Sequence, residues 1–164
     1  VASRNPCKCG YYPNRSRCHC REDDVKRYLS RISRPLLDRI DLHVQSEEVR
    51  YQDLVNETKE ECSADIRQRV ELAHKRQQYR YRKAAWRFNS EIPASVLEEY
   101  CGFGKAEKER MAYLFEKKHM TARAFHRMLR VARTIADIDG AEKVKVSHLD
   151  EAFLYRPDEL LERR

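Results

Sequence analysis

Residues 121–140 read TARAFHRMLRVARTIADIDG and carry the clearest structural signal in the chain. Their apolar side chains recur every three or four positions, which places them on one face of a helix. Thr121 is the expected N-cap, because its hydroxyl can accept a hydrogen bond from a backbone amide of the first turn. Gly140 is the expected stop, because glycine tolerates the left-handed backbone that ends many helices. The residues expected to face the core are Phe125, Met128, Leu129, Ala132, Ile135 and Ala136.

Further helices are predicted on both sides of this stretch. A long helix should begin at Thr58 or Ser63 and end near Phe88. Three shorter ones should follow, bounded by glycine and proline: residues 93–101, 105–118 and 147–156. Their expected inward residues are Ile66, Val70 and Ala73, then Met111, Leu114 and Phe115, then Leu149, Ala152 and Phe153. Helices joined by short loops form a bundle, so the sequence predicts a mainly α fold.

The first 55 residues have a different character. Residues 1–24 are rich in Cys, Pro, Asn and Arg, which predicts a structured loop rather than a periodic element. A short helical stretch follows. After it comes Ile40-Asp41-Leu42-His43-Val44, whose alternation of apolar and polar residues suits a strand.

Length and composition exclude a membrane protein. The 164 residues suffice for one domain, or for a small domain with an appendage. No apolar run approaches the about 18 residues that span a bilayer, and the first residues carry no apolar export signal. The chain starts at Val1 rather than at a methionine, so we expect it to be part of a longer protein.

Common catalytic motifs are missing from the sequence. There is no G-x-x-x-x-G-K-[ST] loop for nucleotide phosphates, because the one Gly-Lys pair, Gly104-Lys105, is followed by Ala106. There is also no G-x-S-x-G and no H-E-x-x-H. The chain alone is therefore expected to be catalytically inactive.

Two Cys-x-Cys pairs lie close together, Cys7-Lys8-Cys9 and Cys18-His19-Cys20. Four thiolates at this spacing can complete the tetrahedral shell of a structural zinc ion, which would hold a loop that lacks a core of its own. His19 could replace one of the cysteines. Disulfides are the alternative, disfavoured by the missing export signal and by two further cysteines, Cys62 and Cys101.

The excess positive charge is concentrated in one segment. The formal net charge is +7, and residues 66–88 hold eight Lys or Arg and one Glu. Tyr79, Tyr81, Trp86 and Phe88 lie among these cations, a combination typical of surfaces that bind nucleic acid. A solvated helix face is the alternative. The residues expected to contact nucleic acid are Arg76, Arg80, Arg82, Lys83 and Arg87.

Two other arginines have positions that suit contact with a phosphate. Arg39 lies between Asp38 and Asp41, either of which could aim its guanidinium at an anion, although ordinary ion pairing is the alternative. Arg123 falls in the first turn of the helix after Thr121, where free backbone amides favour an anion. The other arginines expected on the polar face of that helix are Arg127, Arg130 and Arg133. A solvated basic face would explain them equally well.

Three N-terminal segments resemble the ComM/YifB branch of the magnesium-chelatase-like AAA+ ATPases. They are residues 5–12 (NPCKCGYY), 17–20 (RCHC) and 31–41 (RISRPLLDRID). Residues 121–137 resemble the C-terminal domain of the same family. The resemblance implies three parts: the end of an AAA+ core with its last strands (1–55), a long basic connecting helix (56–89) and a helical lid domain (90–164).

The resemblance also implies roles for individual residues. Asn5 matches the sensor 1 residue beside the γ-phosphate and the attacking water. Arg39 matches the arginine finger, which reaches the nucleotide of a neighbouring subunit. Arg123 matches sensor 2, which touches nucleotide phosphate from the lid. Four cysteines match positions where a loop-stapling metal is expected: Cys7, Cys9, Cys18 and Cys20. The chain departs from the family pattern at Arg34, where glycine is usual.

Cofactors and partners follow from the same resemblance. An upstream AAA+ core of the same protein should supply the phosphate-binding loop and the carboxylates that hold ATP and Mg²⁺. Neighbouring subunits should form a ring, a hexamer, that acts on DNA during recombination or branch migration in the bacterial cytoplasm. The alternative is a stand-alone zinc-stapled DNA-binding or assembly module. Without the upstream strands, residues 90–164 should fold independently, and residues 1–55 should be irregular, self-associated or held by zinc.

Overall fold

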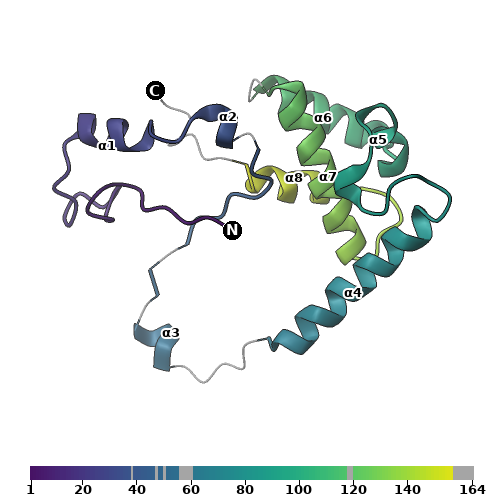
Figure 1. Ribbon diagram of the computed structural model, residues 1–164, viewed down its shortest axis with the longest axis horizontal. Coiled ribbons are helices and arrows are strands. Elements are labelled where there is room, and N and C mark those ends of the chain that lie inside the picture. The colour runs from purple at the N-terminus through teal and green to yellow at the C-terminus, as the bar shows by residue number, and fades with distance from the viewer. Residues whose placement is uncertain (38, 47, 50, 56–60, 118–119, 157–164) are drawn as a thin grey trace. The chain divides into compact units, whose positions relative to one another are not determined.

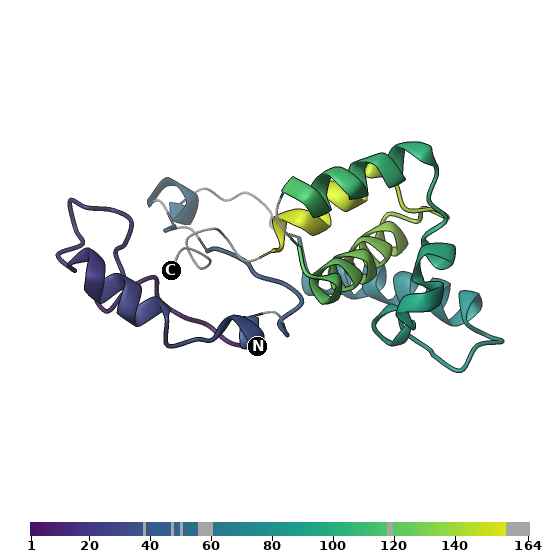
Figure 2. The same cartoon turned by 90° about the horizontal axis from the view of Figure 1, so that it is seen from above.

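The chain divides into two units, the first containing Val1–Ile40 and the second Asp41–Arg156 (Figures 1 and 2). The computed structural model describes residues 1–37, 39–46, 48–49, 51–55, 61–117 and 120–156. Helices are the regular elements of these residues, which confirms the mainly α prediction. They are α1 (Glu22–Leu29), α2 (Arg34–Leu37), α3 (Tyr51–Val55), α4 (Ser63–Arg80), the 3-10 helix η1 (Asn89–Glu91), α5 (Ala94–Cys101), α6 (Lys105–Lys117), α7 (Ala122–Ile138) and α8 (Val146–Leu154).

Helix α7 is the centre of the second unit, where it packs against α4, α5, α8 and η1 (Figure 1). The Thr121 hydroxyl accepts a hydrogen bond from the Ala124 amide at 3.2 Å, which confirms the predicted N-cap. The helix ends just before Gly140, whose φ of +73° is favourable only for glycine. Five predicted inward residues are buried and Phe125 is half-buried: Met128, Leu129, Ala132, Ile135 and Ala136. The periodicity therefore identified the core face of this helix correctly.

The other helices contribute apolar side chains to the same core. Leu97 from α5, Leu114 from α6 and Leu149 from α8 are buried against α7 and its neighbours. Each such burial stabilises the fold by about 1.5–3 kcal/mol relative to an exposed side chain. Phe115 is an exception to the prediction: it is exposed, although its ring packs edge-on against Phe125 at 5.5 Å between centroids. No helix in the described part of the chain combines the length and apolar character needed to cross a membrane.

Helix α4 is shorter than predicted, ending at Arg80 rather than near Phe88. The chain turns because polar groups on either side of the turn pair with each other. The Asn89 amide donates to the Gln77 side chain at 3.0 Å, and the Tyr81 hydroxyl donates to the Asn89 side chain at 2.6 Å. These three residues are buried. The turn therefore pairs buried polar groups that a continuous helix would hold too far apart to form hydrogen bonds.

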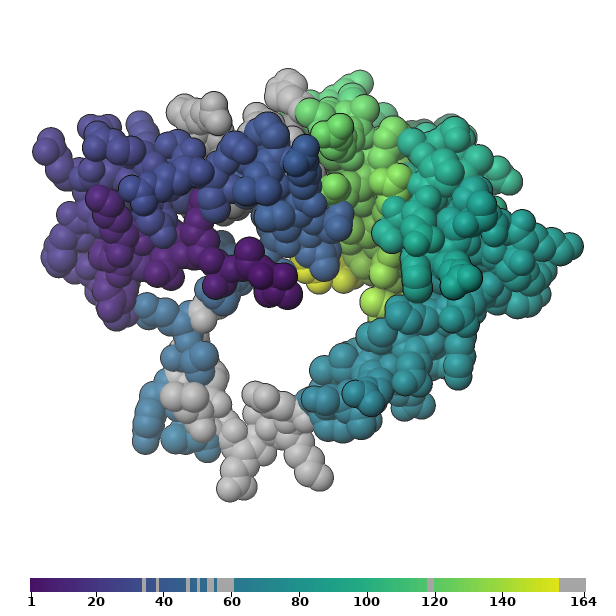
Figure 3. Space-filling model, viewed as in Figure 1, coloured from purple at the N-terminus to yellow at the C-terminus, as the bar shows by residue number. Residues whose placement is uncertain are grey.

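The N-terminal half of α4 was also predicted incorrectly. Ile66 and Val70 are 44% and 43% exposed, although Ala73 on the same face is buried. The buried residues of α4 are Ala73 and Gln77, both in its C-terminal half. Figure 3 shows the N-terminal end of this helix standing clear of the other helices of its unit. The apolar face is continuous in the sequence, but among the residues that the structure describes only its C-terminal part packs against another helix.

The predicted strand at residues 40–44 does not form. These residues are irregular, and Ile40, Leu42 and Val44 are exposed. A strand is stable only when a neighbouring backbone pairs with it, and the described residues contain no second strand. A hydrogen bond from the His43 amide to the Tyr155 carbonyl at 2.9 Å and the Asp41–Arg127 ion pair at 3.1 Å hold this segment within the second unit.

A buried ionic network links the long helices of the second unit. The Asp137 carboxylate is fully buried. It accepts hydrogen bonds from Arg80, from Arg133 at 2.9 Å and from the side-chain Nδ2 of Asn89 at 2.9 Å. Burial on its own would lower the pKa of Arg80, but the Asp137 carboxylate raises it, which keeps the guanidinium charged. Arg133 also donates to the carbonyls of Ala141 and Glu142. The network thus ties α4, η1 and the end of α7 together.

Replacing Asp137 with alanine should destabilise the second unit by about 3–5 kcal/mol, because the buried Arg133 guanidinium would lose its charged partner. Urea unfolding followed by the helical circular dichroism signal measures the loss. Asp150→Ala is the matched control, because the Arg110–Asp150 pair, at 2.6 Å, is partly exposed. Its loss should cost less than about 1 kcal/mol. Equal effects of the two substitutions would contradict the network's structural role.

Candidate functional site

The first unit brings the four N-terminal cysteines together. Gly10, with φ +85°, reverses the chain after Cys9, and its amide donates to the Cys7 carbonyl at 3.1 Å. A second turn, closed by the Cys18 amide and the Asn14 carbonyl at 2.8 Å, returns Cys18 and Cys20 to the first pair. The two Cys-x-Cys pairs therefore face each other within a loop that contains no regular element.

The sulfur atoms have the spacing of a tetrahedral metal shell. Cys9 Sγ lies 3.3 Å from Cys7 Sγ and 3.6 Å from those of Cys18 and Cys20. Cys7 and Cys18 are 3.8 Å apart, and all four sulfurs lie within 4.8 Å of one another. A zinc ion with Zn–S bonds of about 2.3 Å separates its sulfurs by about 3.8 Å. The four thiols therefore fit one tetrahedral zinc ion, and His19 is not part of the set.

Disulfides, the alternative to a metal, are not formed. All six cysteines lie in the described residues and each is a free thiol. Burial opposes ionisation of Cys7, but hydrogen bonds from the Tyr12 backbone and from Cys9 lower its pKa to about 6. Burial raises the pKa of Cys18 to about 11, and hydrogen bonds with Cys9 and Cys7 act in the same direction. Metal ligation requires the thiolate form, so a divalent cation would offset the charge of the ionised thiols.

The cysteine cluster is also the apolar core of the first unit. Cys7 and Cys18 are buried against Val25 of α1, and Tyr12, Cys20 and Leu29 pack around them. Arg4 donates to the carbonyl of Leu29 at 3.3 Å, at the other end of α1. A core of this size is too small to order 40 residues on its own, since small domains normally need a metal or disulfides.

Two of the residues predicted to contact nucleotide lie in the first unit. Asn5 is exposed, and its side chain lies beside Gly10: a Cβ atom on that glycine would be 4.0 Å from the Asn5 Cγ. Arg39 is exposed in the turn after α2, where its amide donates to the Leu36 carbonyl at 3.0 Å. Of the two acids expected beside Arg39, Asp41 pairs with Arg127 at 3.1 Å, and Asp38 lies outside the described residues.

Arg123, the third such residue, is the second residue of α7 and is exposed. The other arginines of this helix differ from the prediction that they share a polar face. Arg133 is fully buried in the Asp137 network. Arg130 donates to the Ile92 carbonyl at 2.7 Å, and Arg127 is partly buried beside Asp41. Arg123 therefore differs from these three in extending into solvent.

The basic segment separates into structural and exposed residues. Arg80 binds Asp137, and Arg76 donates to the Asp137 carbonyl at 2.8 Å, so both are engaged within the fold. Arg82, Lys83 and Arg87 are exposed. Among the aromatic residues, Tyr81 is buried and Trp86 is half-buried beside Tyr100, whereas Tyr79 is 70% exposed. The Arg82 guanidinium lies over the Tyr79 ring, 4.1 Å from its centroid.

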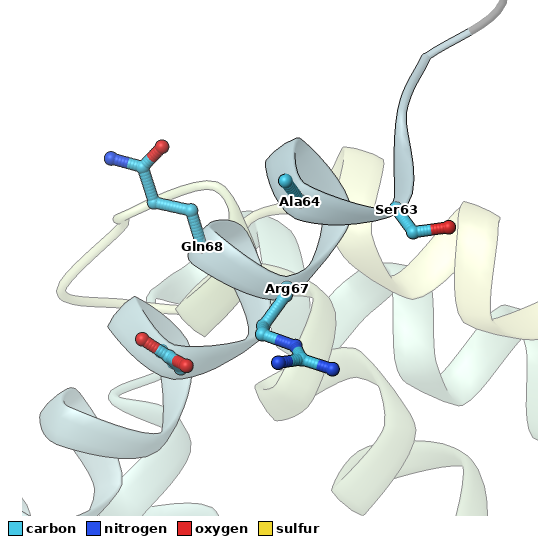
Figure 4. A pocket seen from close by; sticks show the side chains of 5 residues that line it. Ser63, Ala64, Arg67 and Gln68 are labelled. Carbon is cyan, nitrogen blue, oxygen red and sulfur yellow. The ribbon is translucent and has the colours of Figure 1, made fainter.

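A shallow depression at the start of α4 was not anticipated from the sequence (Figure 4). Its lining comes from that one helix: Ser63, Ala64, Arg67, Gln68 and Glu71. Figure 4 shows the Gln68 and Arg67 side chains pointing in different directions. A surface formed by one helix, without convergent polar groups, does not enclose a ligand.

Two sequence profiles match the chain in succession. Residues 1–54 match the family described as "Magnesium chelatase, subunit ChlI", and residues 60–156 match "Magnesium chelatase, subunit ChlI C-terminal". The chain belongs to the magnesium chelatase family. The resemblance deduced from the N-terminal segments and from residues 121–137 is thereby confirmed.

Similar proteins within this family come from several bacteria. The chain is 37% identical over 162 residues to protein YifB of Escherichia coli and 35% identical over 159 residues to YifB of Salmonella typhimurium. It is 31% identical over 157 residues to the competence protein ComM of Haemophilus influenzae. Each of these matches covers 95% of this chain but only 30% of the relative. The chain thus spans less than a third of the length of the relatives it matches.

The two cysteines outside the cluster should differ in reactivity. Burial raises the pKa of Cys101 to about 12, so its thiol stays protonated at pH 8, and it is also inaccessible. Cys62 is exposed. Iodoacetamide at pH 8 should therefore alkylate Cys62 in the folded chain and leave Cys101 unmodified until denaturant is added. Peptide mass mapping measures both sites, and labelling of Cys101 without denaturant would contradict the described core.

Proposed function

We propose that this chain is the sensor, arginine-finger and lid portion of an ATP-dependent AAA+ motor. The observation that carries the proposal is the ordered match of both family profiles along residues 1–54 and 60–156. The phosphate-binding loop and the Mg²⁺-holding carboxylates of such a motor would lie in an upstream core of the same protein. Neighbouring subunits of a ring, a hexamer, would complete each nucleotide site.

The three nucleotide-contacting residues would act on a phosphate held elsewhere. Asn5 would orient the attacking water, and its amide can donate and accept the required hydrogen bonds. Arg39 would stabilise the charge that develops on the transferred phosphoryl group in a neighbouring subunit. Arg123 would contact a nucleotide phosphate from the lid. The exposure of Arg39 and Arg123 is compatible with these roles, because neither guanidinium is buried in the fold.

The four cysteines of the first unit would hold a structural zinc ion. The supporting observation is the spacing of their sulfur atoms, which is 3.3–3.8 Å for the closest pairs. The apolar core around these cysteines is small. Four thiolate ligands leave no open position, so the ion would stabilise the loop rather than take part in catalysis.

DNA would be the substrate on which the motor acts, in recombination or branch migration. Arg82, Lys83, Arg87 and the exposed ring of Tyr79 support this proposal, since they combine phosphate-binding charge with a stacking surface. A second candidate function, a stand-alone zinc-stapled DNA-binding or assembly module, rests on the same surface and gives Arg39 and Arg123 no role. Nucleotide hydrolysis distinguishes the two.

The 164-residue chain should release no phosphate from ATP in a malachite-green assay. When it is joined to a segment carrying G-x-x-x-x-G-K-[ST], hydrolysis should appear, and Arg39→Ala should reduce kcat by about 10³-fold or more. Mixing Arg39→Ala subunits with subunits mutated in the phosphate-binding loop should restore part of the activity, because a finger acts on its neighbour. Lys8→Ala, a change of equal charge in the same unit, is the control. Unchanged kcat in Arg39→Ala would contradict the assignment.

Replacing Arg82, Lys83 and Arg87 together with alanine should weaken binding of single-stranded DNA. Log K falls as log salt rises, and loss of three phosphate contacts should make the slope of this fall less steep by about 2. Fluorescence anisotropy across a salt series measures both quantities. The control is Lys105, Lys108 and Lys117 to alanine, which removes the same charge from exposed positions of α6. An equal loss in both triple variants would contradict a specific surface.

A further inference from the structure

The four sulfurs of the cysteine cluster differ in their access to solvent. Cys7 and Cys18 are buried, whereas Cys9 is exposed and Cys20 is half-exposed. We call Cys7 and Cys18 the inner pair and Cys9 and Cys20 the outer pair. The two sulfurs of the outer pair are 3.6 Å apart. A small oxidant dissolved in water therefore meets two adjacent sulfurs before it reaches the inner pair.

The outer pair is arranged so that its two sulfurs can form a disulfide. The thiolate is the form of cysteine that peroxides oxidise, and a thiol that coordinates a metal is deprotonated. A sulfenic acid formed on Cys9 would have Cys20 within reach, so a disulfide can form without movement of distant segments.

We propose that the cysteine cluster is a peroxide-responsive metal site, in which oxidation of the outer pair releases the bound ion. This inference rests on the zinc site proposed above. One thiolate of the outer pair attacks a peroxide oxygen, which breaks the O–O bond, forms a sulfenic acid and releases hydroxide. The second thiolate attacks that sulfur, which forms the S–S bond and releases a second hydroxide. Two thiolates thus lose two electrons to one hydrogen peroxide.

Loss of the outer pair leaves two thiolates, too few for a closed tetrahedral zinc shell. The ion is then released, and the inner pair is oxidised by a second peroxide in the same way. The inner pair forms the core of the first unit with Val25, so metal release removes the main support of α1. An isolated helix of eight residues is not stable in water.

The same change reaches a residue of the proposed nucleotide site. Asn5 lies two residues before Cys7, and its side chain lies beside Gly10 within the cysteine loop. Oxidation would therefore release Asn5 from its position as well as α1. Peroxide would thereby regulate the motor, because oxidation would disorder the first unit and displace Asn5.

The test uses the zinc-loaded 164-residue chain and hydrogen peroxide as the probe. Released zinc is measured with the chromophore 4-(2-pyridylazo)resorcinol, and disulfides are mapped by mass spectrometry without reduction. One zinc ion per chain should be released for every two peroxides consumed, and Cys9–Cys20 should be the first disulfide. A phosphine reductant with added zinc should restore binding and the circular dichroism signal of α1.

The control is the Cys62→Ser, Cys101→Ala double variant, which keeps the cluster and removes the two other thiols. It should release zinc with the same stoichiometry as the unaltered chain. Zinc retained at a tenfold excess of peroxide, or a first disulfide that includes Cys62, overturns the redox inference and leaves the zinc site standing. A chain that binds no zinc before peroxide is added overturns both proposals.

Discussion

The buried carboxylate of Asp137 holds the second unit together, because donors from separate segments converge on it. The donor from α4 is Arg80 and the donor from η1 is Asn89. Arg133, the third donor, lies one turn before Asp137 in α7 itself. A buried charge without its partners costs several kcal/mol, so any packing in which one of these segments moves away is strongly disfavoured. The apolar core supplies most of the stability, whereas this network fixes which arrangement of the helices is adopted.

The first unit depends on a different kind of support. Its apolar core consists of Cys7, Cys18 and Val25 with a few neighbouring side chains, and α1 contributes one fully buried residue. Conformational entropy of about 1–2 kcal/mol per ordered residue exceeds what such a core can offset. In the zinc site proposed above, binding of the metal by the four thiols would supply the missing free energy. A metal that supplies the stability of a unit also makes that unit sensitive to loss of the metal.

Membership of the magnesium chelatase family places the exposed residues in a functional context. Matched relatives are about three times longer than this chain, so the nucleotide site proposed above would draw on residues outside it. Within the chain, the fold separates cations that hold the structure, such as Arg76, Arg80 and Arg133, from cations that reach solvent, such as Arg39 and Arg123. Arg39 and Arg123 are therefore accessible to a ligand, as the roles proposed for them require.

Local patterns in the sequence were sufficient to predict several features. The helix from Ala122 to Ile138, its Thr121 cap, its Gly140 stop and the cysteine quartet were all predicted, because each follows from residues close together in the chain. The family resemblance identified Asn5, Arg39 and Arg123 as candidates, and their roles stay predictions.

Tertiary contacts controlled the features that local patterns missed. The end of α4 at Arg80 follows from the pairing of Gln77 with Asn89. Exposure of Ile66 and Val70 follows from the absence of a packing partner within the described residues. Burial of Arg133 could not be read from helical spacing, since its counter-charge, Asp137, is shared with Arg80 from another helix. Helix periodicity and capping need only neighbours in sequence, whereas burial and pairing need neighbours in space.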